Sequence, residues 1–187
     1  MLVLIYLGIV ALIVLFVAMT YNRFINLKNG IESTLQQINV ALKKRLDMIG
    51  QIVDATKGQM KFEKSTLTEV TKLRTQAAGN LTSAEAQKLA AQTSKLAGSI
   101  AIQVEAYPKL SSNENVKQLI NSVETAEQEI AQLRYTYNNM VQEFNTKTET
   151  VPSNMIASMF GFAKTHYLKM QEDQAALDKR PDTSLKI

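Results

Sequence analysis

The sequence predicts an all-α protein in which an N-terminal transmembrane helix continues into a long antiparallel helical bundle with a short fourth helix. Three observations support this fold class. An uncharged apolar run opens the chain, apolar residues then recur at helical spacings, and only three Pro and seven Gly interrupt 187 residues. We expect a transmembrane anchor over 1–22, a helical bundle over 23–170 and a polar tail over 171–187.

The first expected element is a membrane anchor, because Leu2 to Met19 is an unbroken apolar run of 18 residues, counting Gly8. A cleaved signal peptide would have a cationic start and a shorter apolar core, and a buried globular helix is the other alternative. Arg23 and Lys28 follow the run, whereas no Lys or Arg precedes it. The positive-inside rule therefore predicts a single-pass protein of the inner (plasma) membrane, with the N-terminus outside and the bundle in the cytoplasm.

The second element is a long helix beyond the anchor. Its stripe has spacings of three and four, which is the α-helical period: the apolar residues Phe24, Leu27, Ile31, Leu35, Ile38, Leu42, Leu46, Ile49 and Val53, then Thr56 and Met60. The pattern predicts one helix from Asn22 to Ala78, roughly 85 Å long if it is continuous.

Two further long helices are expected after Gly79. Thr82 and Glu85 have the spacing of a capping box, and Pro108 should end the helix that they open. Ser111 and Glu114 have the same spacing. Four heptads follow, typical of a bundle or coiled-coil seam: Val116, Leu119, Val123, Ala126, Ile130, Leu133, Tyr137, Met140 and Phe144.

The three long helices should form an up-down-up bundle. The helix from Ser112 to Glu149 is acidic where the first helix is basic, which favours contact between the two, although a solvated charged face is the alternative. Pro152 should close this helix, and Ser153 or Asn154 should cap a short apolar fourth helix.

The composition indicates that the protein is not an enzyme. With no Cys, disulfides, thiolate metal sites and cysteine nucleophiles are excluded, and a single His leaves little for metal binding or acid–base catalysis. The chain has no HExxH, Walker, GxGxxG or GxSxG motif. We predict no catalytic residue, no metal and no cofactor. Despite a net charge of +4, the basic residues lack interleaved aromatics, so we expect no nucleic-acid partner.

Three groups of residues are candidates for interaction. The membrane-proximal part of the first stripe should exceed what the other helices can cover. Arg45 and Arg134 lie at the edges of apolar stripes and need a partner, as structural pairs or as docking residues. A methionine-rich patch is either an adaptable docking surface or packing. The candidates are Phe24, Ile31, Leu35, Ile38, Arg45, Arg134, Met155, Met159 and Phe160.

The sequence resembles the LemA family of bacterial membrane-anchored helical proteins. The most distinctive segment is Ile38-Asn39-Val40-Ala41-Leu42-Lys43-Lys44-Arg45-Leu46-Asp47-Met48-Ile49, with Tyr107-Pro108, Tyr137-Asn138 and Phe160-Gly161-Phe162 later. Asn39, Gly50 and Val151 depart from the family pattern, where an acidic residue, a proline and an aromatic are common. The resemblance implies a membrane-bound helical bundle with no established catalytic activity, loosely connected with membrane-protein quality control and membrane remodelling.

These observations lead to two functional hypotheses. The first is a non-enzymatic, membrane-anchored scaffold that self-assembles and organises or shapes the membrane, with a homo-oligomer and membrane lipid as partners. The alternative is an accessory subunit that docks another envelope membrane protein, such as a protease or a transporter.

Overall fold

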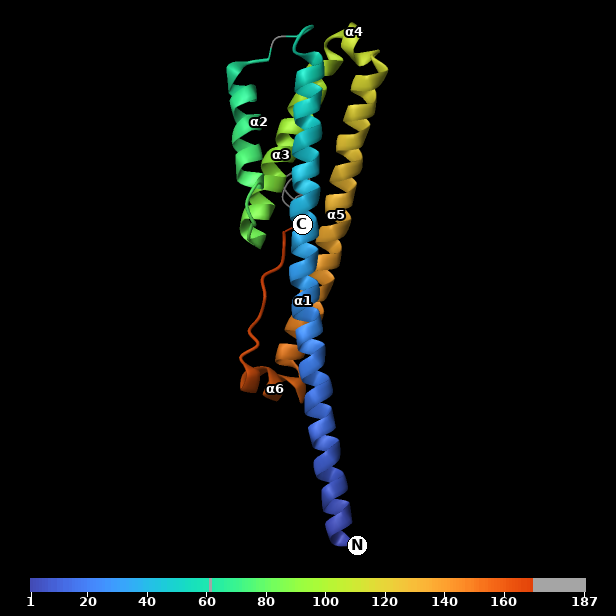
Figure 1. Cartoon of the computed structure of the whole chain (residues 1–187), viewed down its shortest axis with the longest axis vertical. Coiled ribbons are helices and arrows are strands. Elements are labelled where there is room, and N and C mark those ends of the chain that lie inside the picture. Colours follow the sequence, from blue (N-terminus) through green and yellow to red (C-terminus); the bar gives the residue numbers. More distant parts are fainter. Residues whose placement is uncertain (61, 170–187) are drawn as a thin grey trace, which may run out of the picture. The chain divides into compact units, whose positions relative to one another are not determined.

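The computed structural model describes residues 1–60 and 62–169, and in these residues six helices and no strand are present (Figure 1). The helices are α1 (Leu2–Thr56), α2 (Lys64–Ala77), α3 (Ser83–Glu105), α4 (Pro108–Ser111), α5 (Glu114–Glu149) and α6 (Ser153–Phe160). The all-α prediction is confirmed. The predicted polar tail, 171–187, and the last residue of the predicted bundle lie outside the described residues.

Contacts divide the chain into two units, with the boundaries inside α1 and α5. The anchor unit comprises Met1–Gln36 and Tyr135–Tyr167. The Arg45 unit comprises Gln37–Arg134 and, of the described residues that follow, Leu168 and Lys169. Each unit therefore contains part of α1 and part of α5.

In the anchor unit, the start of α1 is apolar and exposed. Residues 2–16 are all exposed, and α1 is the one helix in the described residues that is long and apolar enough to cross a membrane. Phe24, Leu27 and Ile31, further along the same helix, are buried. Because water disfavours a helix that is apolar on every face, this exposed segment suggests a membrane anchor.

In the Arg45 unit, four helical segments run side by side: residues 37–56 of α1, then α2, α3 and residues 114–134 of α5 (Figure 1). Each presents apolar side chains to a common core, among them Leu42, Leu73, Leu89 and Ile130, all at most 2% exposed. Burying one stripe from each helix is the usual source of stability in a bundle.

The prediction of one helix from Asn22 to Ala78 is wrong, because α1 ends at Thr56 and α2 begins at Lys64. Lys57, Gly58 and Gln59 are exposed, so no burial offsets the cost of glycine in a helix, about 1 kcal/mol relative to Ala. The bundle consequently has one more long segment than the predicted up-down-up arrangement. The fragment after the break restarts the apolar stripe on a separate helix, with Val70 and Leu73 buried.

The predicted start of α3 is confirmed. The Thr82 amide donates to Glu85 Oε2 at 2.9 Å, and the Glu85 amide donates to Thr82 Oγ1 at 3.4 Å, which together form a capping box. The hydrogen bonds from Thr82 lower the pKa of the Glu85 carboxyl. α3 ends at Glu105, as expected before a proline, but Pro108 also opens the unpredicted short helix α4.

The two other predicted caps are wrong. Asn113, not Ser111, caps α5, since Asn113 Oδ1 accepts from the Asn115 amide at 3.0 Å. Pro152 precedes α6 without a side-chain cap, and the Ser153 hydroxyl donates instead to the Lys147 carbonyl at 2.8 Å. In these two places the cap position lies two residues after and one residue before the predicted one, which sequence spacing alone does not fix.

The heptad seam of α5 is largely confirmed. Val116, Val123, Ala126, Ile130, Tyr137 and Phe144 are buried, whereas Leu119, Leu133 and Met140 are half-buried. Arg134 and Val141 are buried as well, so the buried stripe is wider than the predicted seam. A stripe of this width is typical of a helix in contact with more than one neighbour.

Ile130→Asp tests this core, because Ile130 is 0% exposed and an unpaired carboxylate there has no water. We expect the variant to lose cooperative unfolding in detergent, or to lose several kcal/mol, on the order of 3 or more. Ala131→Asp makes the same change at the next, exposed position and should melt like the parent. Equal melting of the two variants would show that α5 does not bury this face.

Candidate functional site

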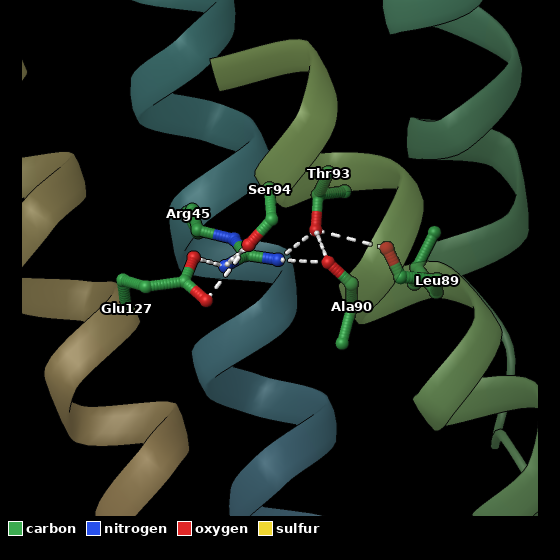
Figure 2. Close-up of polar contacts among 6 residues, drawn as sticks. All are labelled: Arg45, Leu89, Ala90, Thr93, Ser94 and Glu127. Carbon is green, nitrogen blue, oxygen red and sulfur yellow. Dashed lines mark hydrogen bonds and ion pairs between the residues drawn. The ribbon is translucent and has the colours of Figure 1, made fainter. Parts of the chain in front are cut away.

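Among the residues that the structure describes, Arg45 is the largest fully buried side chain, 0% exposed, and it lies among three helices of the Arg45 unit (Figure 2). Its Nη2 donates to the Ala90 carbonyl of α3 at 2.8 Å and to the Thr93 hydroxyl. Thr93 is itself 0% exposed, and its hydroxyl is 2.9 Å from the Leu89 carbonyl. A side chain of α1 therefore crosses to the backbone of α3 and fixes the contact between the two helices.

Glu127 of α5 provides the opposite charge. It forms an ion pair with Arg45 Nη1, and its Oε1 accepts from the Ser94 hydroxyl at 2.8 Å. Ser94 Oγ also lies 3.4 Å from Arg45 Nη1. Figure 2 shows the guanidinium between the carboxylate of Glu127 on one side and the α3 oxygens on the other. A buried charge is tolerated only with such partners.

A second buried cation, Arg134, belongs to the same unit and is 6% exposed. Burial, and then the nearby charge of Arg134, lower the pKa of Arg45 to about 10. Burial also lowers the pKa of Arg134. Arg45 still keeps its proton at neutral pH. Both arginines that the sequence singled out are thus buried in the Arg45 unit, and Arg45 has an ion-pair partner within the chain.

The predicted attraction between the basic first helix and the acidic helix α5 is confirmed at several points. In the anchor unit, Arg23 Nη2 lies 2.6 Å from Glu143 Oε1. In the Arg45 unit, Lys44 Nζ lies 3.5 Å from Glu129 Oε2, beside the pair of Arg45 and Glu127. The two exposed pairs are worth little individually, so the buried pair is the one that matters for stability.

An open apolar groove of about 280 Å³ lies next to the Arg45 network, between α1, α3 and α5. Ser94 and Glu127 belong to both, so the carboxylate stands at the groove's polar edge. Glu124 also lines the groove, and apolar and small side chains form the rest, including Ile49, Gly98 and Ile120. The volume is at the small end for a ligand pocket and better suits one or two apolar side chains of a partner.

The described residues contain no group of three or more His, Cys, Asp and Glu that could hold a metal ion. The network itself offers a fixed positive charge, a partly exposed carboxylate that accepts from the Ser94 hydroxyl, and a Thr93 hydroxyl that is paired with a backbone carbonyl.

The predicted membrane-proximal stripe is not left uncovered. Phe24, Ile31 and Ile38 are 0%, 8% and 1% exposed, and Leu35 is half-buried. In the anchor unit, Met140 of α5 packs on α1 so closely that a Cβ at Gly30 would lie 3.0 Å from its sulfur. The premise that this stripe has no partner within the chain is wrong, because the end of α5 returns along it.

The other candidates lie near the end of the apolar run, in the anchor unit. The Phe24 ring stacks on Phe162 at 4.7 Å and meets the edge of Phe144 at 5.5 Å. The ring centroids of Tyr21 and Phe160 are 4.7 Å apart. Of the predicted patch, Phe160 is thus in this aromatic cluster, whereas Met155 and Met159 remain 70% and 75% exposed. Packing covers part of Phe160, which is still 45% exposed, and neither methionine.

Several site residues were not singled out from the sequence. Thr93 is a polar residue within the apolar stripe of Leu89, Leu96 and Ile100. A polar residue at such a position indicates a buried hydrogen bond. Ser94 gives no comparable signal. The sequence does place Glu127 on the stripe of Arg134, seven residues before it, but it does not indicate that Glu127 pairs with Arg45.

Two departures from the family pattern have a physical role in the structure. Gly50 lets the Arg74 guanidinium lie against α1, and a Cβ there would push this flexible side chain aside. Arg74 Nη2 reaches the Asp47 carboxylate at 3.6 Å from there. Asn39 Nδ2 donates to the Leu81 carbonyl at 3.2 Å, a hydrogen bond that a carboxylate could not donate.

Comparison with known proteins shows which family the sequence matches. Residues 34–184 match the model of the LemA family, and this match covers most of the chain. The chain belongs to the LemA family. A curated relative, protein LemA of Metamycoplasma hominis, is 26% identical over 137 residues, 73% of this chain. The aligned part spans 63% of that relative's length. The resemblance in the sequence is confirmed, and the matched segment includes both buried arginines and the whole of α6.

Glu127→Gln tests the network, because it leaves Arg45 buried without its carboxylate. We expect the free energy of unfolding to fall by about 1–3 kcal/mol, less than for a fully buried pair because the Glu127 side chain is 41% exposed. Adding Arg45→Met should recover part of the loss. Glu129→Gln breaks an exposed pair and should change stability by less than about 1 kcal/mol. Chemical denaturation gives all three values, and equal effects of the two glutamine variants would contradict the assignment.

Proposed function

We propose that this chain is a non-enzymatic, membrane-anchored helical scaffold that self-assembles and thereby organises or shapes the membrane. The main support for the proposal is that the two parts of α1 differ in their surroundings. Its first residues are apolar and exposed, and its later residues, from Phe24 onward, bury one face in the packed helices. A helix of this kind suits a lipid-embedded start and a water-facing domain on the same element.

Exposed apolar side chains outside the anchor support self-assembly. In the Arg45 unit, Val40 of α1 is 68% exposed and Ile102 of α3 is 70% exposed. Identical anchors in one bilayer also raise the effective concentration of these surfaces for one another. We therefore place the proposed interface at a surface that includes Val40. The stripe of Phe24, Ile31 and Ile38, which the sequence suggested for this role, is buried within the chain.

The apolar groove beside Glu127 favours a second candidate function, that of an accessory subunit of another membrane protein. A helix or loop of such a partner could place apolar side chains in the groove and a donor on the carboxylate. The two functions differ in what covers the exposed apolar surface, which is a second copy in one case and a different protein in the other.

We propose that the N-terminus faces the outside and the packed helices face the cytoplasm. Arg23 and Lys28 follow the apolar run, and Arg23 lies one turn of helix beyond its end, at the headgroup level. Positive charges on this flank are retained on the cytoplasmic side.

Single cysteines test assembly and orientation, since the natural chain has none. Val40→Cys in native membranes should form disulfide-linked dimers on mild oxidation, whereas Lys72→Cys, exposed on α2, should crosslink much less. The mass in mild detergent should be that of one homogeneous homo-oligomer. A monomer that co-purifies with a different protein would favour the accessory subunit and contradict the scaffold.

The Lys72→Cys variant also reports orientation. A maleimide reagent that cannot cross membranes should leave this cysteine unlabelled in intact cells and should label it after lysis. Labelling in intact cells would place α2 outside and overturn the proposed orientation.

A further inference from the structure

The exposed face of α6 presents apolar side chains, and the last residue of the helix contacts Tyr21, just beyond the apolar run of α1. We propose that α6 lies in the interface of the membrane as a second lipid contact, with Met155, Met159 and Phe160 inserted among the lipid chains. The inference rests on the membrane anchor of the proposed function, but not on self-assembly.

The surface of α6 has the composition of an interfacial helix. Its sequence carries no charged residue, and Met155 and Met159 are four residues apart, so they share one face. Both are at least 70% exposed, as is Val151 just before the helix. The opposite side is held in the protein through buried Ile156 and Ala157. Exposure of such an apolar surface to water is unfavourable, whereas insertion into lipid would bury it.

The hydroxyl groups of α6 do not oppose insertion. Ser158 Oγ donates to the Asn154 carbonyl at 3.0 Å, and Ser153 Oγ donates to the Lys147 carbonyl at 2.8 Å. Paired hydroxyls cost little to move from water into the interface.

The aromatic cluster sets the depth of α6 relative to the span. Tyr21 lies two residues beyond the apolar run, where an aromatic of the membrane interface is expected. Its ring is 4.7 Å from Phe160, the last residue of α6. Figure 1 shows α6 beside α1 in this unit. The end of α6 is therefore at the same level as the end of the span.

The chain after α6 holds the helix in this position. Gly161 has a φ of 71°, in the left-handed region, and the Phe162 amide donates to the Ala157 carbonyl at 2.9 Å. This turn returns Phe162 to the Phe24 ring, on which it stacks. Because tertiary contacts already order α6, the membrane does not have to induce a helix of only eight residues.

Charges near α6 favour apolar insertion over attraction to anionic lipids. Lys164 forms an ion pair with Glu149, and Arg23 forms one with Glu143. Paired charges contribute little to binding at an anionic surface. We therefore expect the contact to form in neutral phosphatidylcholine and to be insensitive to salt.

Tryptophan fluorescence tests the proposal, because the natural chain contains no Trp. The full chain with Met159→Trp is reconstituted in phosphatidylcholine vesicles with and without bromine on the acyl chains. We expect a blue-shifted emission and loss of most of the intensity in brominated lipid, with little quenching by iodide from the water. Ser33→Trp, at an exposed position of α1 that lies 14 residues beyond the apolar run, should be quenched less by bromine and more by iodide.

A Phe16→Trp variant in the span separates this proposal from the anchor on which it depends. If Phe16→Trp is quenched by brominated lipid and Met159→Trp is quenched by iodide, the anchor holds and α6 lies in water, which overturns the inference. If Met159→Trp is shielded from both quenchers, another protein surface covers α6, and the inference is equally wrong. If Phe16→Trp itself is not quenched by brominated lipid, the anchor and everything built on it fail.

Discussion

The constraint on which the rest of the structure depends is that the first residues of α1 are apolar on every side, and the described residues leave them exposed. Each Leu, Ile, Val or Phe of that run favours a lipid environment by about 0.3–0.6 kcal/mol, and no charge opposes them. Lipid is the environment that satisfies such a segment. Once α1 starts in a membrane, the aromatic cluster at Tyr21 and Phe24 falls at the membrane surface, and α6 falls beside it.

The Arg45 network determines how the helices of its unit pack against one another. Burying a guanidinium costs several kcal/mol before its partners are counted, and replacement of a buried ion pair by apolar residues is often neutral or stabilising. Arg45 nevertheless reaches oxygens of α3 and the carboxylate of α5 at once. An apolar side chain at this position could pack, but could not require those particular neighbours. The network therefore fixes which faces of α1, α3 and α5 meet, and it leaves Glu127 at the edge of a groove.

Local sequence signals predicted much of the fold. The helical period, the capping box at Thr82 and the stop before Pro108 are short-range effects, and the structure confirms them. The break after Thr56 was missed because glycine within a periodic stripe only weakens a helix, and tertiary contacts decide whether it bends or ends. The capping error at Ser111 has a similar origin, since Asn113 competes for the same position.

Long-range packing was beyond the sequence. Periodicity identifies the buried face of a helix but not the segment that covers it, so Phe24 and Ile31 were expected to be free although Phe144 and Met140 return to cover this part of α1. Arg45 was recognised as a buried cation, but its partners on α3 lie about 45 residues away along the chain. Family membership was predictable because it depends on residue order alone.

The central claim is that α1 passes from lipid into a packed protein core within a few residues of Tyr21. A spin label placed at each position in turn from Val10 to Ile31, in the reconstituted full chain, measures access to oxygen and to a water-soluble nickel complex. We expect access to oxygen without helical periodicity up to Met19. Beyond it, access to both oxygen and the nickel complex should have minima at Phe24, Leu27 and Ile31. Access of the nickel complex before Met19, or a helical period of protection there, would contradict it.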